Sequence, residues 1–269
     1  MNSTEIVGFS ASVLIGVSLG LIGGGGSILT LPVMVYLLHI SPVTSTAYSL
    51  FVVGTTSLVG SASFMQKKLV NYRAALVFAI PSFTTVFLTR KYLVPAIPDP
   101  LMSFSGFDVS KNVGIMVFFA LIMLAASYSM IKNKKEEKDE NTGELKFNYP
   151  MIALEGALVG MLTGIVGAGG GFLIIPALVL FARLPMKMAV GTSLLIIAAK
   201  SLIGFLGDLS NLTVDWAFLL PFTALSVGGI FVGTYLSKFI SGEKLKKSFG
   251  WFVLVMGIYI ITKEVFFKA

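Results

Sequence analysis

The chain contains no cysteine and only one histidine, His39. Disulfides, thiolate metal sites and cysteine nucleophiles are therefore excluded, and a metal site built from several histidines cannot form. We expect neither a bound metal nor a cofactor. Charged residues are also scarce, at 12% of 269 residues against 55% hydrophobic residues. That balance leaves too little polar surface to coat a water-soluble globule.

What the chain has instead is a series of long apolar runs. Most of them approach or reach the roughly 20 residues that cross a bilayer, and in lipid such runs form helices because the backbone must satisfy its own hydrogen bonds. The sequence therefore predicts an all-α polytopic membrane protein. Glu5 is the only charged residue before the first run, so the run lacks the basic start of a signal peptide. We therefore interpret it as a retained helix rather than a cleaved signal. The runs cover residues 6–22, 45–64, 74–88, 112–131, 151–166, 189–206, 216–236 and 248–262.

The net charge of +7 comes from basic residues in the loops between these runs. That placement is the usual pattern of membrane proteins, so the lipid bilayer is the expected partner and nucleic acid is not.

An internal repeat links the two halves of the chain. A shift of 144 residues places segment 20–32 on segment 164–176, where four glycines, a leucine and the closing Pro32 and Pro176 coincide. The same register aligns Ser49 with Ser193 and Ser57 with Ser201. Such self-similarity indicates two copies of one structural unit. We expect a first transmembrane repeat at 1–131, a charged cytoplasmic linker at 132–148 and a second repeat at 149–269, all in one integral domain.

Each glycine cluster is either a kink in a spanning helix or a turn between two shorter helices. With kinks, the lysines and arginines divide almost evenly between the two sides of the membrane. With turns, residues 27–38 and 171–182 become short returning helices, and each half makes five passes. Fourteen lysines and arginines then lie on one side of the membrane and five on the other. The positive-inside rule favours the second arrangement. It predicts two inverted repeats, each with a broken or re-entrant helix pair plus about three further transmembrane helices, and both termini outside.

Inverted repeats with broken helices are typical of secondary transporters, whose substrate lies near the membrane midplane. A helix that begins after a glycine break directs free N–H groups at its surroundings, and converging helix N-termini favour an anion. Glycines that only permit close helix packing are the main alternative. The predicted substrate-binding residues are Gly24, Gly25, Gly26, Ser27 and Ser49 in the first half, and Ala168, Gly169, Gly170, Gly171, Thr192, Ser193 and Lys200 in the second.

Lys200 lies in the middle of an apolar run and takes the place of Thr56 in the repeat. A charge inside a membrane span is costly, so we interpret it either as a counter-charge for the anion or as a structural partner of Asp208 or Glu155. We place Glu155 near the interface and His39 in a solvated loop. The membrane-span hydroxyls could equally join helices.

The residues assembled above resemble the sulfite exporter TauE/SafE family over essentially the whole chain. The resemblance rests on the duplicated glycine segments ending in Pro32 and Pro176, on segments 47–50 (AYSL) and 191–194 (GTSL), and on Asp215-Trp216. The first half departs from that pattern, with Tyr48 in place of Thr192 and Asn71 in place of Asp215. The family implies a permease of small sulfur-containing anions such as sulfite, thiosulfate or organosulfonates.

We therefore expect a secondary transporter in the bacterial inner membrane that works by alternating access. An anion channel of the same fold and a carrier of another small anion stay as alternatives. An enzyme is not expected, because no nucleophile–base pair or metal cluster is evident in the sequence. Exposed small-residue helix faces are compatible with a homodimer.

Overall fold

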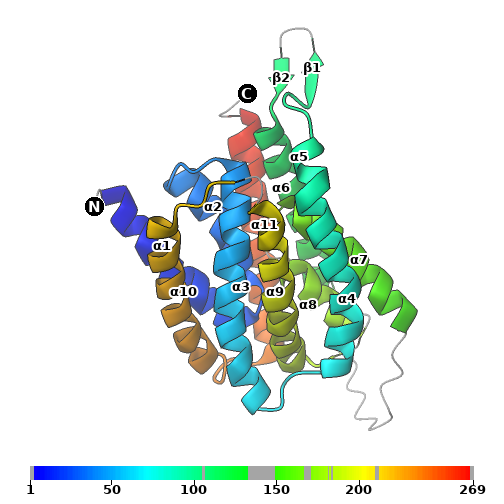
Figure 1. Cartoon of the computed structure of the whole chain (residues 1–269). Helices are drawn as coiled ribbons and strands as arrows, with labels where there is room; N and C mark the ends of the chain where they lie inside the picture. Colours follow the sequence, from blue (N-terminus) through cyan, green and yellow to red (C-terminus); the bar gives the residue numbers. More distant parts are fainter. Residues whose placement is uncertain are drawn as a thin grey trace.

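The computed structural model describes residues 3–104, 107–132, 149–166, 171–180, 182, 184–209 and 212–266, and is almost entirely helical there (Figure 1). The first half contains α1 (Ser3–Ile22), α2 (Gly25–Pro32), the π-helical turn η1 (Val33–Leu37), α3 (Pro42–Gln66), α4 (Tyr72–Leu88), a second π-helical turn η2 (Thr89–Leu93), α5 (Val94–Ala96) and α6 (Lys111–Lys132). A short antiparallel hairpin of β1 (Met102–Phe104) and β2 (Phe107–Val109) lies between α5 and α6. The second half contains α7 (Tyr149–Val166), α8 (Gly171–Leu180), α9 (Met186–Asp208), α10 (Trp216–Leu236) and α11 (Gly242–Phe266).

Within these described ranges, five helices are long and apolar enough to cross a membrane. Three further helices are apolar but shorter, at Val7–Ile22, Gly26–Leu37 and Pro150–Val166. The expected all-helical membrane fold is confirmed at this level. The five long segments are Pro42–Gln66, Tyr72–Ala96, Lys111–Tyr128, Met186–Asp208 and Trp216–Leu236.

The bundle has two ends. At one, the hairpin face, α3 begins, α5 leads into the β-hairpin, and α9 ends; at the other, the linker face, α6 ends and α7 begins (Figure 1). Helix α3 runs from the hairpin face to the linker face, whereas α9 runs in the opposite direction (Figure 1).

The first glycine cluster is a turn, not a kink. Gly23 has a φ of +75°, which is the left-handed region that glycine adopts without strain. After it, α2 folds back along α1, because Gly26 packs on the carbonyl of Ile15 and Leu38 packs on Gly8. The returning helix predicted for residues 27–38 therefore exists, as α2 and η1.

The helices of the two halves pack in a reciprocal pattern. Helix α1 packs on α10, and α7, which corresponds to α1 after the 144-residue shift, packs on α4, which corresponds to α10. The pattern holds at single residues: a Cβ on Gly16 would overlap the carbonyl oxygen of Ser226, and one on Gly160 would lie 2.5 Å from the carbonyl oxygen of Ser82. Gly16 and Gly160 are 144 residues apart, as are Ser82 and Ser226.

The start of each repeat's third long helix is capped in the same reciprocal way. The side chain of Asn71 accepts a hydrogen bond from the Ala74 N–H at the start of α4, and Asp215 does the same for Phe218 at the start of α10. The Asn71 N–H donates to Thr192 Oγ1 at 2.9 Å. The Asp215 N–H donates to Tyr48 Oη at 2.8 Å.

Tyr48 and Thr192 therefore hold equivalent caps from opposite halves. At this position the first copy has a tyrosine and the second copy has a threonine.

Glycines mediate the closest helix contacts. Gly229 and Gly233 of α10 lie against the carbonyls of Val13 and Val17 of α1, as in the close packing of helices through small residues.

Candidate functional site

The two glycine breaks meet at the centre of the bundle. Gly171, the first residue of α8, lies so close to the first break that a Cβ on it would be 2.6 Å from Gly24 Cα and 3.1 Å from the Gly23 carbonyl oxygen. Gly24 is the N-cap of α2 and supplies no side chain for capping. The N-terminal ends of two helices from opposite halves are therefore adjacent. The first backbone N–H groups of each helix have no partner within that helix.

Helix α9 passes both breaks. On one turn, the Ser193 hydroxyl lies 3.0 Å from the position of a Cβ on Gly23. One turn later, Ile197 Cδ1 lies 2.6 Å from the position of a Cβ on Gly171. A further turn along the same helix stands Lys200. Ser193 therefore lies beside the first break and Ile197 beside the start of α8, whereas a shared binding site that includes Lys200 stays a prediction.

Lys200 is completely buried. Its Nζ donates a hydrogen bond to Thr163 Oγ1 at 3.0 Å, in the last turn of α7 before the second break. Across the described part of the chain, no carboxylate lies within ion-pair distance of this ammonium group. The alternative that Lys200 pairs with Asp208 is wrong, because Asp208 is bound to Arg90. Lys200 thus brings a positive charge into an apolar region, and a charge in such a place is stabilised by an anion.

Four buried serines have hydroxyls without a hydrogen-bond partner. Ser49, Ser57, Ser82 and Ser201 have completely buried side chains whose Oγ atoms find no partner among the described residues. Serines within helices usually donate to a carbonyl three or four residues earlier. Ser61 does so to Leu58 at 2.8 Å and Ser193 does so to Val190 at 2.8 Å. Buried polar groups without partners are rare in proteins, so these four hydroxyls are available to bond a water molecule or a ligand.

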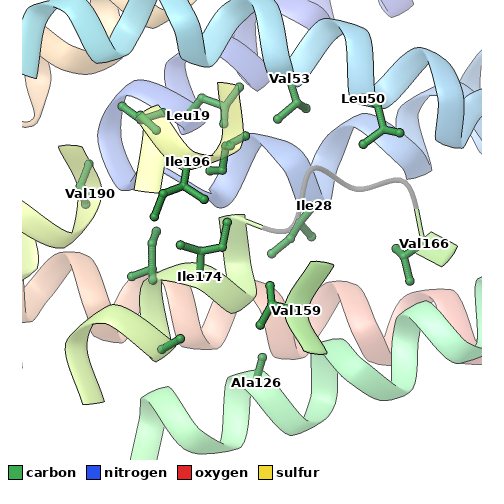
Figure 2. Close-up of a cluster of buried hydrophobic side chains, with 14 of the residues drawn as sticks. Leu19, Ile28, Leu50, Val53, Ala126, Val159, Val166, Ile174, Val190 and Ile196 are labelled. Atoms are coloured by element: carbon green, nitrogen blue, oxygen red, sulfur yellow. The ribbon is translucent and has the colours of Figure 1, made fainter. Parts of the chain in front are cut away.

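Side chains around the breaks are otherwise apolar. Figure 2 shows Leu19 of α1, Ile28 of α2, Ile174 of α8 and Ile196 of α9 in one buried cluster. In such surroundings water is scarce, and electrostatic interactions with Lys200 and the helix ends are stronger than in solvent.

The remaining predicted residues lie as follows. Ser27 is buried at the start of α2, and its hydroxyl donates to the Gly24 carbonyl oxygen at 2.6 Å. Gly25 and Gly26 form the first turn of α2. Thr192 faces the start of α4, where it accepts from the Asn71 N–H. Ala168, Gly169 and Gly170 lie outside the described residues.

Sequence reasoning missed a second buried cation. We treated Arg90 as a loop charge, but the helix continues past Leu88 through η2 to Ala96, and Arg90 is only 1% exposed. It forms an ion pair with Asp208, at 2.6 Å between Nη2 and Oδ2. The apolar residues that resume after Lys91 were the signal that the helix continues.

Glu155 and His39 are the two titratable residues that the sequence places near the interface and in a solvated loop. Glu155 is half-buried in α7, and its Oε1 is buried without a hydrogen-bond partner among the described residues. His39 is exposed in the turn after η1, as predicted. It adopts a positive φ of 55°.

A bundle of apolar helices with two broken helices meeting at its centre defines a class, that of polytopic helical membrane transporters. The comparison with known families gives the particular assignment. The model of the family described as "Sulfite exporter TauE/SafE" matches residues 8–260, so the chain belongs to that family.

Individual relatives agree with this assignment. The chain is 28% identical to a probable membrane transporter protein of Xylella fastidiosa, covering 96% of this chain and 95% of the relative. It is 28% identical to the probable membrane transporter protein YunE of Bacillus subtilis, with 90% and 89% covered. A probable membrane transporter protein of Methanocaldococcus jannaschii is 25% identical, with 95% and 93% covered. No solved structure matches the chain.

Proposed function

We propose that this protein is a secondary transporter that carries a small sulfur-containing anion, such as sulfite, thiosulfate or an organosulfonate, across the bacterial inner membrane. The observation that carries the proposal is the meeting of the two breaks, Gly23–Gly24 and Gly171, beside the turn of α9 that bears Lys200. The family description supports the sulfur-containing cargo.

The anion would lie where the N-terminal ends of α2 and α8 converge. Backbone N–H groups of residues 24–28 and 168–172 would donate to its oxygens, and Lys200 would balance its charge. Ser49 and Ser193 occupy equivalent positions in the repeat. We infer that Ser49 faces the second break as Ser193 faces the first. The anion bound there would then be the hydrogen-bond partner of the Ser49 hydroxyl.

We also propose that the two halves are inverted repeats that alternate access to this site. The reciprocal packing of α1 on α10 and α7 on α4 supports a two-fold relation between the halves, and the opposite directions of α3 and α9 support an axis in the membrane plane (Figure 1). Rocking of one half against the other would then open the site to each side in turn.

Export of an anion needs no coupling ion. Moving one negative charge outward across 100 mV yields about 2.3 kcal/mol, which suffices for an outward gradient of more than tenfold.

The test is uptake of radiolabelled thiosulfate into liposomes containing the purified full-length chain. We expect saturable uptake that unlabelled sulfite competes with and that is accelerated by thiosulfate preloaded inside the vesicles. Uptake without saturation or counterflow would indicate the anion channel instead. Saturable transport of another small anion, with none of sulfite, thiosulfate or isethionate, would overturn the sulfur assignment.

A further inference from the structure

Arg90 is a buried residue whose guanidinium joins four helical segments. Its Nε and Nη2 donate to Asp208 Oδ2 at 2.8 and 2.6 Å. Its Nη1 donates to Thr46 Oγ1 at 3.0 Å and to the Gly164 carbonyl oxygen at 3.1 Å. Through these bonds η2 is held to α9, to α3 and to the last turn of α7.

The position of Arg90 relates it to the central site. Gly164 directly follows Thr163, to which Lys200 is bonded. Asp208 is the last residue of α9 and lies eight residues after Lys200, about 12 Å further along the helix axis. Arg90 and Asp208 therefore lie between the end of α7, where the second break begins, and the hairpin face.

We propose that Arg90 is a second anion-binding residue, on the path between the central site and the hairpin face, and that Asp208 occupies its guanidinium when no anion is there. This inference rests on the proposed function and adds to it a binding step on one side of the membrane. The ligand class is a small oxyanion with at least two terminal oxygens, which the planar guanidinium binds through parallel N–H groups.

The geometry of the ion pair suits an exchange. Both bonds from Nε and Nη2 converge on Oδ2, so the pair does not use the two-oxygen fork that gives arginine its tightest carboxylate complexes. A passing oxyanion can replace Asp208 without leaving Arg90 unpaired at any stage. The exchange keeps a negative charge at Arg90 and so avoids an isolated buried cation, and it requires the Asp208 carboxylate, at the C-terminal end of α9, to turn away from the guanidinium toward the hairpin face.

The repeat makes the feature one-sided. Arg90 corresponds to Thr234 in the second half, and Asp208 corresponds to Phe64 in the first half. On the linker side of the first break the equivalent positions therefore carry no charge. The second anion position is expected on the hairpin side only, which gives the two directions of transport different substrate dependence.

A purely structural role is the competing explanation. A guanidinium near the C-terminal carbonyls of α7 stabilises that helix end, and the ion pair ties α4 to α9. Under that explanation, removing the Asp208 charge weakens the fold and does nothing for anion binding. Under the exchange mechanism, the same change removes a competitor of the anion.

The test measures thiosulfate binding to the purified full-length chain by calorimetry at constant ionic strength, for wild type, Asp208→Asn and Arg90→Gln/Asp208→Asn. We expect Asp208→Asn to bind thiosulfate about tenfold more tightly than wild type, because Arg90 is then always available. The double variant should lose this gain. Asp215→Asn, which removes an exposed carboxylate on the same face and keeps an N-cap, should bind as wild type does.

Unchanged or weaker binding by Asp208→Asn would overturn the inference, and wild-type binding would still support the central site. Binding by Asp208→Asn alone, without binding by wild type, would support Arg90 and count against the central site. Absence of binding by every variant would overturn both.

A second variant covers the case in which Asp208→Asn does not fold. Arg90→Lys keeps the charge for Asp208 but loses the planar fork. In liposomes with the protein in one orientation, we expect it to raise KM about fivefold or more for thiosulfate taken up from the hairpin face, and to leave KM from the linker face unchanged. Equal changes on both faces, or none on either, would overturn the inference.

Discussion

Lys200 and Arg90 are hydrogen-bonded to consecutive residues of one helix. Lys200 Nζ donates to Thr163 Oγ1 at 3.0 Å, and Arg90 Nη1 donates to the Gly164 carbonyl oxygen at 3.1 Å. Both cations are buried, and they reach the last turn of α7 from α9 and η2 respectively. Only Arg90 has a carboxylate partner among the described residues. Two buried basic side chains therefore lie at the end of α7 that leads to the second glycine break, and we propose that an anion balances the charge of Lys200.

Replacing Lys200 tests that balance. We expect Lys200→Gln to weaken thiosulfate binding at least about tenfold, because it removes the charge that a buried anion needs but can keep a hydrogen bond to Thr163. The measurement is calorimetric binding to the purified chain. Lys187→Gln is the matched control, since Lys187 is an exposed lysine at the start of the same helix. Equal affinities for Lys200→Gln and wild type would remove Lys200 from the site.

The meeting of the breaks predicts strict limits on side-chain size. We expect Gly171→Ala to lower the thermal stability of the detergent-solubilised protein, by about 2 kcal/mol or more, because its Cβ would lie 2.6 Å from Gly24 Cα. Gly23→Ala should do the same, since it adds a contact of 2.9 Å to Val190 in a backbone with φ of +75°. Gly228→Ala is the control, because nothing lies within 4 Å of its Cβ position. If Gly171→Ala and Gly23→Ala unfold at the same temperature as Gly228→Ala, the breaks do not touch as described.

The two reciprocal caps predict similar losses of stability when either hydrogen bond is removed. Tyr48→Phe removes the acceptor of the Asp215 N–H, and Thr192→Val removes the acceptor of the Asn71 N–H. We expect each change to destabilise the protein by about 1 kcal/mol, and the double variant to show the sum, because the two contacts belong to different helix starts. Thermal unfolding in detergent measures all three. A strong deviation from additivity would mean that the two contacts are coupled.

The absence of cysteine makes the proposed inversion easy to test. Arg73 and Ala217 are exposed, lie in the first turns of α4 and α10, and are 144 residues apart. With inverted repeats, Arg73→Cys and Ala217→Cys should react with a membrane-impermeant thiol reagent from opposite sides of intact cells and inverted vesicles. Labelling of both variants from the same side would show parallel repeats.

The architecture could be predicted from the sequence because membrane helices depend on local features. Apolar runs set the spans, Asn71 and Asp215 cap α4 and α10 as their positions suggest, and Pro32 and Pro176 follow the breaks at equal distance. The first break is a turn because Gly23 adopts a backbone conformation that few other residues tolerate.

Contacts between distant segments could not be predicted in this way. Arg90 and Asp208 lie 118 positions apart, and Arg90 stands beside Lys91, in a pair of charges that is typical of a loop. Only the continuation of the helix through η2 turns Arg90 toward α9. Thr163 was overlooked for a related reason: a threonine near a helix end carries no signal of the lysine that approaches it from another helix.

The most direct test of the central claim is thiosulfate counterflow in liposomes, compared between wild type and Lys200→Gln at equal protein content. Our account predicts saturable uptake by wild type that thiosulfate inside the vesicles accelerates, and a loss of at least about tenfold in Lys200→Gln. Equal flux by the two proteins, or no sulfur-anion flux by wild type, would contradict it.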